Sequence, residues 1–113
     1  MTYNSFWSEP EWVTPDRIQE IFNQCQYYER VIRGELNKRI WGYDNHLKRR
    51  QRQILGEPLC TRSQIVLYYG LSGEPLALVH QYLRRNGELG GSGKPDPKRI
   101  FVSGRVIAVS QSP

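Results

Sequence analysis

Hydrophobic residues recur every three or four positions from residue 18 to residue 40, which is the spacing of an amphipathic helix. The members of this stripe are Ile18, Ile21, Phe22, Cys25, Tyr28, Ile32, Leu36 and Ile40. A typical helix start precedes it, because Thr14 offers a hydroxyl cap, Pro15 tolerates the first turn and Asp16 complements the positive helix end. We therefore predict a helix that begins at Pro15.

The same spacing continues to Leu55, but one unbroken helix of ~40 residues would be ~60 Å long, far longer than a domain of this size. A break is therefore expected, either at Gly34 or at residues 41–44. We favour the second position, since Asp44 is able to cap a new helix that runs to Leu55. The prediction for residues 14–56 is a helical hairpin.

After residue 61 the pattern changes to short runs of β-branched and aromatic residues between turn residues, which favours strands. Four strands are expected, at residues 64–69, 74–85, 99–102 and 105–109. Ser-Gly pairs at 72–73 and 103–104 are hairpin-length connections, so the strands that they join should be antiparallel. The sequence thus predicts an α+β fold, with an N-terminal helical hairpin packed on one face of a four-stranded antiparallel sheet.

Length and composition favour a single domain over residues 1–113, with 38% hydrophobic and 12% aromatic residues to form a core. Residues 1–13 are expected to form an aromatic arm before the helical part (14–56) and the sheet (61–110), which contains a Gly/Pro loop at 86–98. No apolar run reaches the ~20 residues of a membrane span and no basic leader is seen, so we expect a cytoplasmic protein. The two cysteines have no metal-ligand spacing, and no metal or cofactor is expected.

The net charge of +5 and the pI near 9.5 favour an acidic partner, nucleic acid or another polyanion. Eight basic and two acidic residues lie between positions 30 and 52. A solvated helix face is the alternative explanation for such a block. The candidate contacts are Arg33, Lys38, Arg39, Lys48, Arg49, Arg50 and Arg52, together with Ser92, Lys94, Lys98 and Arg99 of the Gly/Pro loop region.

A second hypothesis concerns His80. Alternation along residues 74–85 places His80, Tyr82 and Arg84 on one face of the predicted strand, and the loop that follows could bring Lys94 to the same face. A metal-independent ribonuclease needs such groups: His80 would be the base, and Arg84 or Lys94 would stabilise the developing negative charge. The alternative is a strand histidine whose nitrogens are satisfied by its neighbours.

The C-terminal half contains the string VHQYLRRNGELGGSGKPDPK at residues 79–98. This string resembles the closing segment of small uncharacterised proteins from bacteria, phages and other mobile elements. The resemblance covers about residues 74–102 and implies a bacterial or phage origin, but no activity comes with it. A third hypothesis is therefore a phage-type inhibitor or adaptor that binds a host protein through Trp7 and Trp12, since tryptophan is common at protein interfaces.

Overall fold

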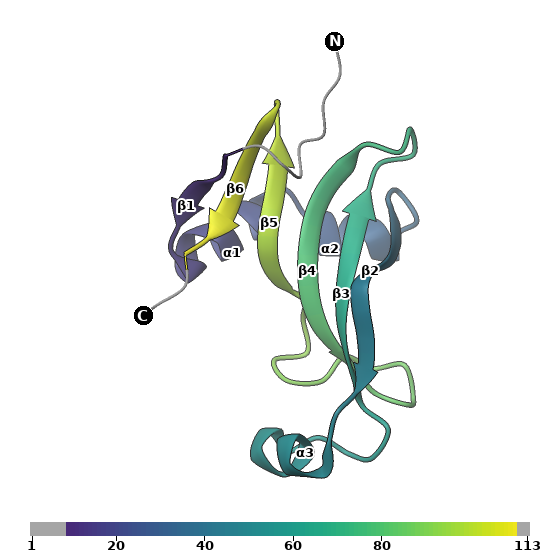
Figure 1. Ribbon diagram of the computed structural model, residues 1–113. Helices are drawn as coiled ribbons and strands as arrows, with labels where there is room; N and C mark the ends of the chain where they lie inside the picture. The colour runs from purple at the N-terminus through teal and green to yellow at the C-terminus, as the bar shows by residue number, and fades with distance from the viewer. Residues whose placement is uncertain (1–8, 111–113) are drawn as a thin grey trace.

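The computed structural model describes residues 9–110 and has an α+β fold built on one six-stranded mixed sheet (Figure 1). The strands are β1 (Glu11–Val13), β2 (Asn37–His46), β3 (Arg62–Tyr69), β4 (Pro75–Leu83), β5 (Asp96–Val102) and β6 (Arg105–Val109). The helices are α1 (Pro15–Gln24), α2 (Tyr27–Ile32) and α3 (Arg49–Leu55). The strands lie in the order β1-β6-β5-β4-β3-β2, with β1 parallel to β6 and all other neighbours antiparallel.

Helices α1 and α2 lie behind the sheet in Figure 1, whereas α3 lies beyond its lower end. Ile18 and Phe22 of α1 pack against strand residues such as Val79, and together they form the main core. The sheet face that α1 and α2 leave uncovered is called the open face below. It carries Ser63, Ile65, Leu67 and Tyr69 of β3 and Leu78, His80 and Tyr82 of β4, as strand alternation and register require.

The predicted start of the first helix is confirmed. Thr14 has extended backbone angles, and its side-chain oxygen accepts a hydrogen bond from the Arg17 backbone N–H at 3.1 Å. Pro15 occupies the first turn and Asp16 lies at the positive end of the helix. The helix nevertheless ends at Gln24, because Gln26 adopts a left-handed conformation (φ 55°) before α2 begins.

The predicted helical hairpin over residues 14–56 is wrong, because residues 37–46 form strand β2 along the edge of the sheet. Gly34, with φ 79°, lies directly after α2, and Gly42, with φ 100°, lies within an irregularity of the β2–β3 pairing. Nearly every residue of β2 is exposed. An edge strand with both faces in solvent lacks the alternation of apolar and polar residues by which strands are recognised in a sequence. The few apolar residues of β2 also fit the three- and four-residue spacing of a helix.

The predicted four-stranded antiparallel sheet is also wrong, since β1 and β2 add one strand at each edge and β1 is parallel to β6. The four strands expected after residue 61 are all present. Part of the expected aromatic arm is strand: β1 is joined to β6 by backbone pairing and by an ion pair between Glu11 and Arg105. Trp12 on β1 is 57% exposed, and Trp7 lies outside the described residues.

No helix within residues 9–110 is long and apolar enough to cross a membrane.

A matched pair of substitutions tests the assigned layers. Ile18 of α1 is buried against the sheet, whereas Ile54 of α3 is 72% exposed. We expect Ile18→Ala to lower the free energy of unfolding by about 2–5 kcal/mol, because it leaves a cavity in the core. Ile54→Ala should change it by no more than about 0.5 kcal/mol. Urea denaturation of both variants measures the difference, and equal losses would contradict the placement of α3 outside the core.

Candidate functional site

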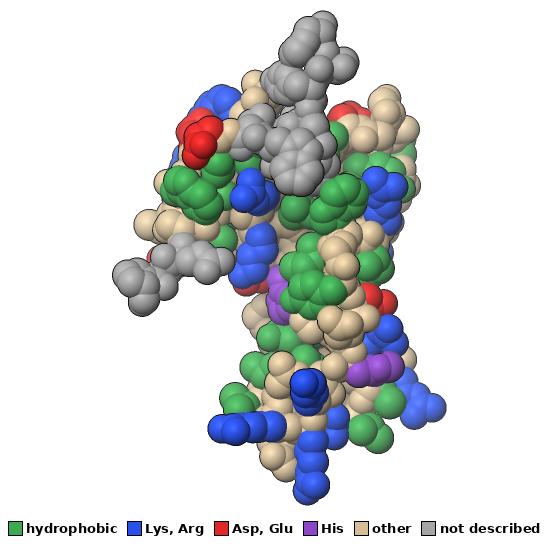
Figure 2. Space-filling view, in the orientation of Figure 1, with side chains coloured by type: hydrophobic (Ala, Val, Ile, Leu, Met, Phe, Trp, Pro, Cys, Tyr) green, Lys and Arg blue, Asp and Glu red, His purple; other side chains and the backbone are tan. Residues whose placement is uncertain are grey.

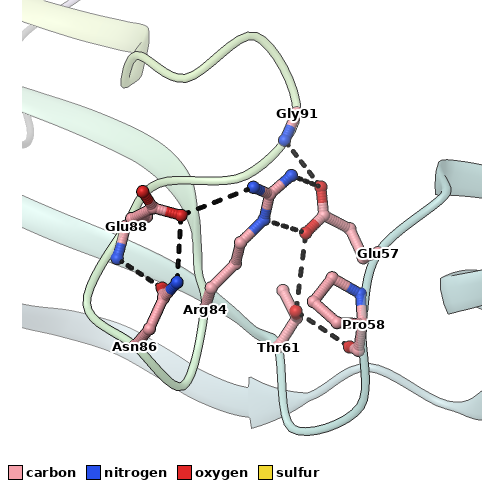
Figure 3. A network of polar contacts seen from close by, with 7 residues as sticks. All are labelled: Glu57, Pro58, Thr61, Arg84, Asn86, Glu88 and Gly91. Atoms are coloured by element: carbon pink, nitrogen blue, oxygen red, sulfur yellow. Dashed lines mark hydrogen bonds and ion pairs between the residues drawn. The ribbon is translucent and has the colours of Figure 1, made fainter.

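The end of the molecule around α3 is held in place by one buried carboxylate, that of Glu57 (Figure 3). Its side chain is 1% exposed. Arg84 donates from Nε to Glu57 Oε1 (2.9 Å) and from Nη2 to Oε2 (3.3 Å), and the Gly91 backbone N–H donates to Oε2 (2.7 Å). The Thr61 hydroxyl lies 3.4 Å from Oε1 and 3.0 Å from the Pro58 carbonyl oxygen. Oε2 therefore accepts two hydrogen bonds, while Oε1 accepts one from Arg84 and shares the single Thr61 hydroxyl hydrogen with the Pro58 carbonyl oxygen.

This arrangement keeps Glu57 charged. The hydrogen bonds from Arg84 lower the pKa of the Glu57 carboxyl below its ordinary value; burial opposes this shift and the Gly91 N–H adds to it. Glu57 follows α3, while Arg84 and Gly91 lie at the two ends of the turn after β4. The carboxylate thus joins the α3–β3 connection to the β4–β5 loop.

The Gly/Pro loop has the form of an anion-binding loop, but its anion belongs to the chain itself. A Cβ atom at Gly90 would overlap the Glu57 carboxylate, and Gly91 has φ 60°, which favours glycine. Ser92 Oγ contacts the backbone of Lys94 within a local turn. Gly90 and Gly91 are therefore explained by an internal ion pair. Arg84, which the sequence suggested as a catalytic group, is part of that pair.

His80 lies on the open face, where its neighbours satisfy one ring nitrogen. His80 Nε2 is 2.8 Å from Ser63 Oγ, and Ser63 Oγ is 3.4 Å from the Tyr43 hydroxyl. The Tyr82 ring packs edge-on against the imidazole at 4.7 Å between centroids, and Asp96 is the residue opposite His80 in the β4–β5 pairing. The structure does not bring Arg84 to His80, because Arg84 bonds Glu57.

The environment of His80 favours the neutral imidazole. Burial lowers the pKa of His80 below its ordinary value, the positive charge of Lys98 lowers it further, and the Asp96 carboxylate opposes both effects. Lys98 itself donates to Asp96 Oδ2 at 2.8 Å. Such a histidine is an acceptor and donor of hydrogen bonds near pH 7 rather than a fixed cation.

A cavity of about 740 Å³ opens beside His80. Its walls come from α1, β2, β3, β4, the start of β5 and the Gly/Pro loop. Its lining includes Tyr43, His80, Tyr82, Lys94, Asp96 and Lys98. Among the predicted catalytic residues, His80 and Lys94 thus line one cavity and Arg84 does not.

The second feature is a concentration of positive charge at the end of the molecule that carries α3. We define the α3 end as residues 44–62 and 84–88; it holds seven Lys and Arg residues against three Asp and Glu, which is four of the five net charges of the chain. Figure 2 shows basic side chains gathered at this end, around α3. Lys48, Arg49 and Arg50 are exposed, and no ion pair joins them to a carboxylate within residues 9–110.

The three carboxylates of the α3 end all have partners. Asp44 accepts from Arg62 Nε at 2.6 Å, Glu57 accepts from Arg84, and Glu88 accepts from the Asn86 amide at 3.0 Å. A second cavity, of about 320 Å³, lies at the same end of the molecule. Its lining is formed by His46, Cys60, Arg62, Leu83, Arg84 and Arg85, and so contains no carboxylate.

The predicted nucleic-acid contacts do not form one surface. Lys48, Arg49, Arg50 and Arg52 lie together on and before α3, although Arg52 also donates to the Leu47 carbonyl oxygen at 3.1 Å. Arg33 is paired with Glu35 near the other end of the sheet (Nε to Oε2, 2.6 Å), and Lys38 is the second residue of β2 there. The remaining contacts, Arg39, Ser92, Lys94, Lys98 and Arg99, lie on the open face or in the adjoining loop.

Sequence reasoning missed three residues that shape these surfaces. Glu57 follows a basic block and precedes a proline, and nothing local distinguishes it from a surface acid. Ser63 and Tyr43 come to His80 only through the β2–β3–β4 pairing. Tyr43 had been assigned to a helix break, so its place on the sheet could not be deduced. No group of three or more His, Cys, Asp or Glu side chains suited to a metal ion occurs within residues 9–110.

A double-mutant cycle tests whether the Gly/Pro loop is built around Glu57. Gly90→Ala should lower the free energy of unfolding by about 2–4 kcal/mol, because its methyl group displaces the buried carboxylate from Arg84. In a Glu57→Ala background the same change should be nearly neutral, since space is then available. The non-additivity then equals the Gly90→Ala loss in the wild type, about 2–4 kcal/mol, and is measured by urea denaturation.

Additive effects in this cycle would show that Gly90 is required for another reason. Gly90 is suited to the test because its φ is not in the left-handed region, so the added methyl group causes no backbone strain.

The titration of His80 is a second measurable property of the site. NMR of the imidazole should give a pKa below 6.5, and Lys98→Met should raise it, because that change removes a nearby cation. Asp96→Asn should lower the pKa further. Because the unfolded chain then binds the proton more readily than the folded one, stability should fall as the pH is lowered below about 6.5. A His80 pKa above 6.5 would contradict this environment.

No family model, curated protein or solved structure significantly matches this chain.

Proposed function

We propose that the protein binds nucleic acid, with the α3 end as its main contact with the phosphate backbone. The single observation that carries this proposal is the set of three exposed, unneutralised side chains at Lys48, Arg49 and Arg50, on an element that projects beyond the sheet (Figures 1 and 2). A projecting basic element is able to approach a phosphate backbone without the rest of the domain in the way. The phosphate backbone of a nucleic acid has a high density of negative charge, so several neighbouring cations bind it more tightly than one.

The internal pairing of the carboxylates strengthens this argument. Asp44 and Glu57 are each paired with an arginine, and Glu88 accepts from Asn86 and lies 3.9 Å from Arg84, so none of the three forms an ion pair with Lys48, Arg49 or Arg50. Arg85 is exposed beside the smaller cavity and extends the positive surface past α3. Arginine is able to hold a phosphate through two parallel hydrogen bonds.

Binding is favoured over the ribonuclease hypothesis for a geometric reason. The proposed stabilising cation Arg84 is fixed on Glu57, and Lys98 beside His80 is paired with Asp96. His80 has the neutral form that a general base needs. Of the three cations considered, however, only Lys94 is left to stabilise the negative charge of a phosphorane. The hypothesis of a host protein partner at Trp7 and Trp12 stays a prediction.

Charge reversal tests the proposed contact. The triple change Lys48→Glu, Arg49→Glu and Arg50→Glu should weaken binding of a labelled 20-nucleotide single-stranded oligonucleotide by roughly 100-fold at low salt. The slope of log K against log salt concentration should become less steep by about 2, since each lost phosphate contact removes ~0.7. Fluorescence anisotropy across a salt series measures both. Arg52 is left unchanged because it holds the Leu47 carbonyl.

The matched control makes the same change of charge at the opposite end, with Arg30→Glu, Arg33→Glu and Lys38→Glu. If both triple variants lose affinity equally, the effect is one of net charge and the α3 contact is refuted. The same mixtures, incubated with a chelator, should leave the oligonucleotide intact. Cleavage that His80→Gln abolishes would instead favour the ribonuclease.

A further inference from the structure

The cavity beside His80 has a chemical character that the α3 end lacks. Aromatic side chains of Tyr43 and Tyr82 lie on its wall together with the cations of Lys94 and Lys98. Tyr43 is 41% exposed, and Lys94 is exposed and has no ion pair within the described residues. Flat aromatic faces beside cations suit a ligand that is itself aromatic and anionic.

The size of the cavity limits which aromatic and anionic ligands fit. Its volume of about 740 Å³ lies within the ~300–1,000 Å³ of pockets that hold small organic ligands. A nucleotide combines a base able to stack on a tyrosine ring with a phosphate able to bind a lysine. In a duplex the base faces are covered by their neighbours, so only an unstacked base is able to use such a wall.

From these observations we infer that the cavity beside His80 takes one unpaired nucleotide of a single strand, with its base against Tyr43 or Tyr82 and its phosphate at Lys94. This inference rests on the proposed function and specifies its substrate class as single-stranded nucleic acid. The α3 end then supplies attraction for the backbone, while the cavity selects against duplex.

The path of the chain makes the two surfaces neighbours. Tyr43 lies on β2 only three residues before His46, which lines the smaller cavity of the α3 end, and only five residues before Lys48. At about 3.3 Å per strand residue, Tyr43 and His46 are ~10 Å apart along the strand. Such a separation is short enough for a few nucleotides of one strand to reach both surfaces.

The contacts of His80 are also compatible with nucleotide binding in the cavity. Ser63 Oγ bonds His80 Nε2 and lies near the Tyr43 hydroxyl, which holds these side chains in one arrangement before any ligand enters. Because the imidazole is neutral, it adds no charge for Asp96 to neutralise, and Asp96 stays paired with Lys98. Lys94 therefore remains available for a phosphate.

The experiment compares a single-stranded oligonucleotide with a blunt-ended duplex of the same length by fluorescence anisotropy. Tyr43→Leu combined with Tyr82→Leu keeps apolar volume but removes both rings, and should weaken single-strand binding by roughly 10-fold or more. Lys94→Gln should weaken it several-fold. Duplex binding should be unaffected by either variant, because the duplex contacts only the α3 end.

Matched controls separate the cavity from a general surface effect. Arg17→Gln removes an exposed cation from the first turn of α1, which is not among the candidate contacts, and should leave both affinities unchanged. Lys94→Gln lies in an exposed loop, so it remains informative if the double tyrosine variant unfolds. Thermal denaturation identifies any variant that has lost its fold.

The outcomes distinguish this inference from the proposed function. If the cavity variants bind single strands as the wild type does, while reversal at α3 abolishes binding, the cavity assignment is overturned and the α3 contact stands. Equal loss for single strand and duplex would also overturn it. If the wild-type protein binds neither oligonucleotide, both conclusions fall.

Discussion

The buried carboxylate of Glu57 is the contact on which both candidate surfaces depend. It comes from the segment after α3 and is held by Arg84 and by the Gly91 N–H, which lie on either side of the turn that follows β4. A carboxylate removed from water is costly unless its oxygens are fully satisfied. Through Arg84, Gly91 and Thr61, this carboxylate therefore ties the segment after α3 to the Gly/Pro loop that lies beside His80.

The same contact explains how a basic protein keeps part of its charge available. At the α3 end, Arg62 forms an ion pair with Asp44 and Arg84 forms one with Glu57. These two arginines therefore stabilise the fold and are not available to a ligand. Lys48, Arg49 and Arg50 are then left on a projecting element with no acid beside them. Exposed cations contribute little to folding stability, which is consistent with a role outside the fold.

In the function proposed above, the cavity beside His80 and the α3 end have two different roles in recognition. Cations on a convex element attract a phosphate backbone without reading its conformation. The rings of Tyr43 and Tyr82 lie on the wall of the cavity, and stacking on such rings requires a base that has left its own stack. Strand β2 connects the two because it runs from the open face directly to α3.

The sequence alone determined the features that arise from local chemistry. These are the Thr14 cap with the start of α1, the four strands after residue 61, and the block of basic residues at 30–52. Only the tertiary structure decided that residues 37–46 are a strand, because an edge strand is defined by its backbone pairing with β3 and not by its own pattern. The partners of Arg84 and His80 were decided in the same way. Glu57 is 27 residues from Arg84 and Ser63 is 17 from His80, and separations of that kind are set by how the strands pair.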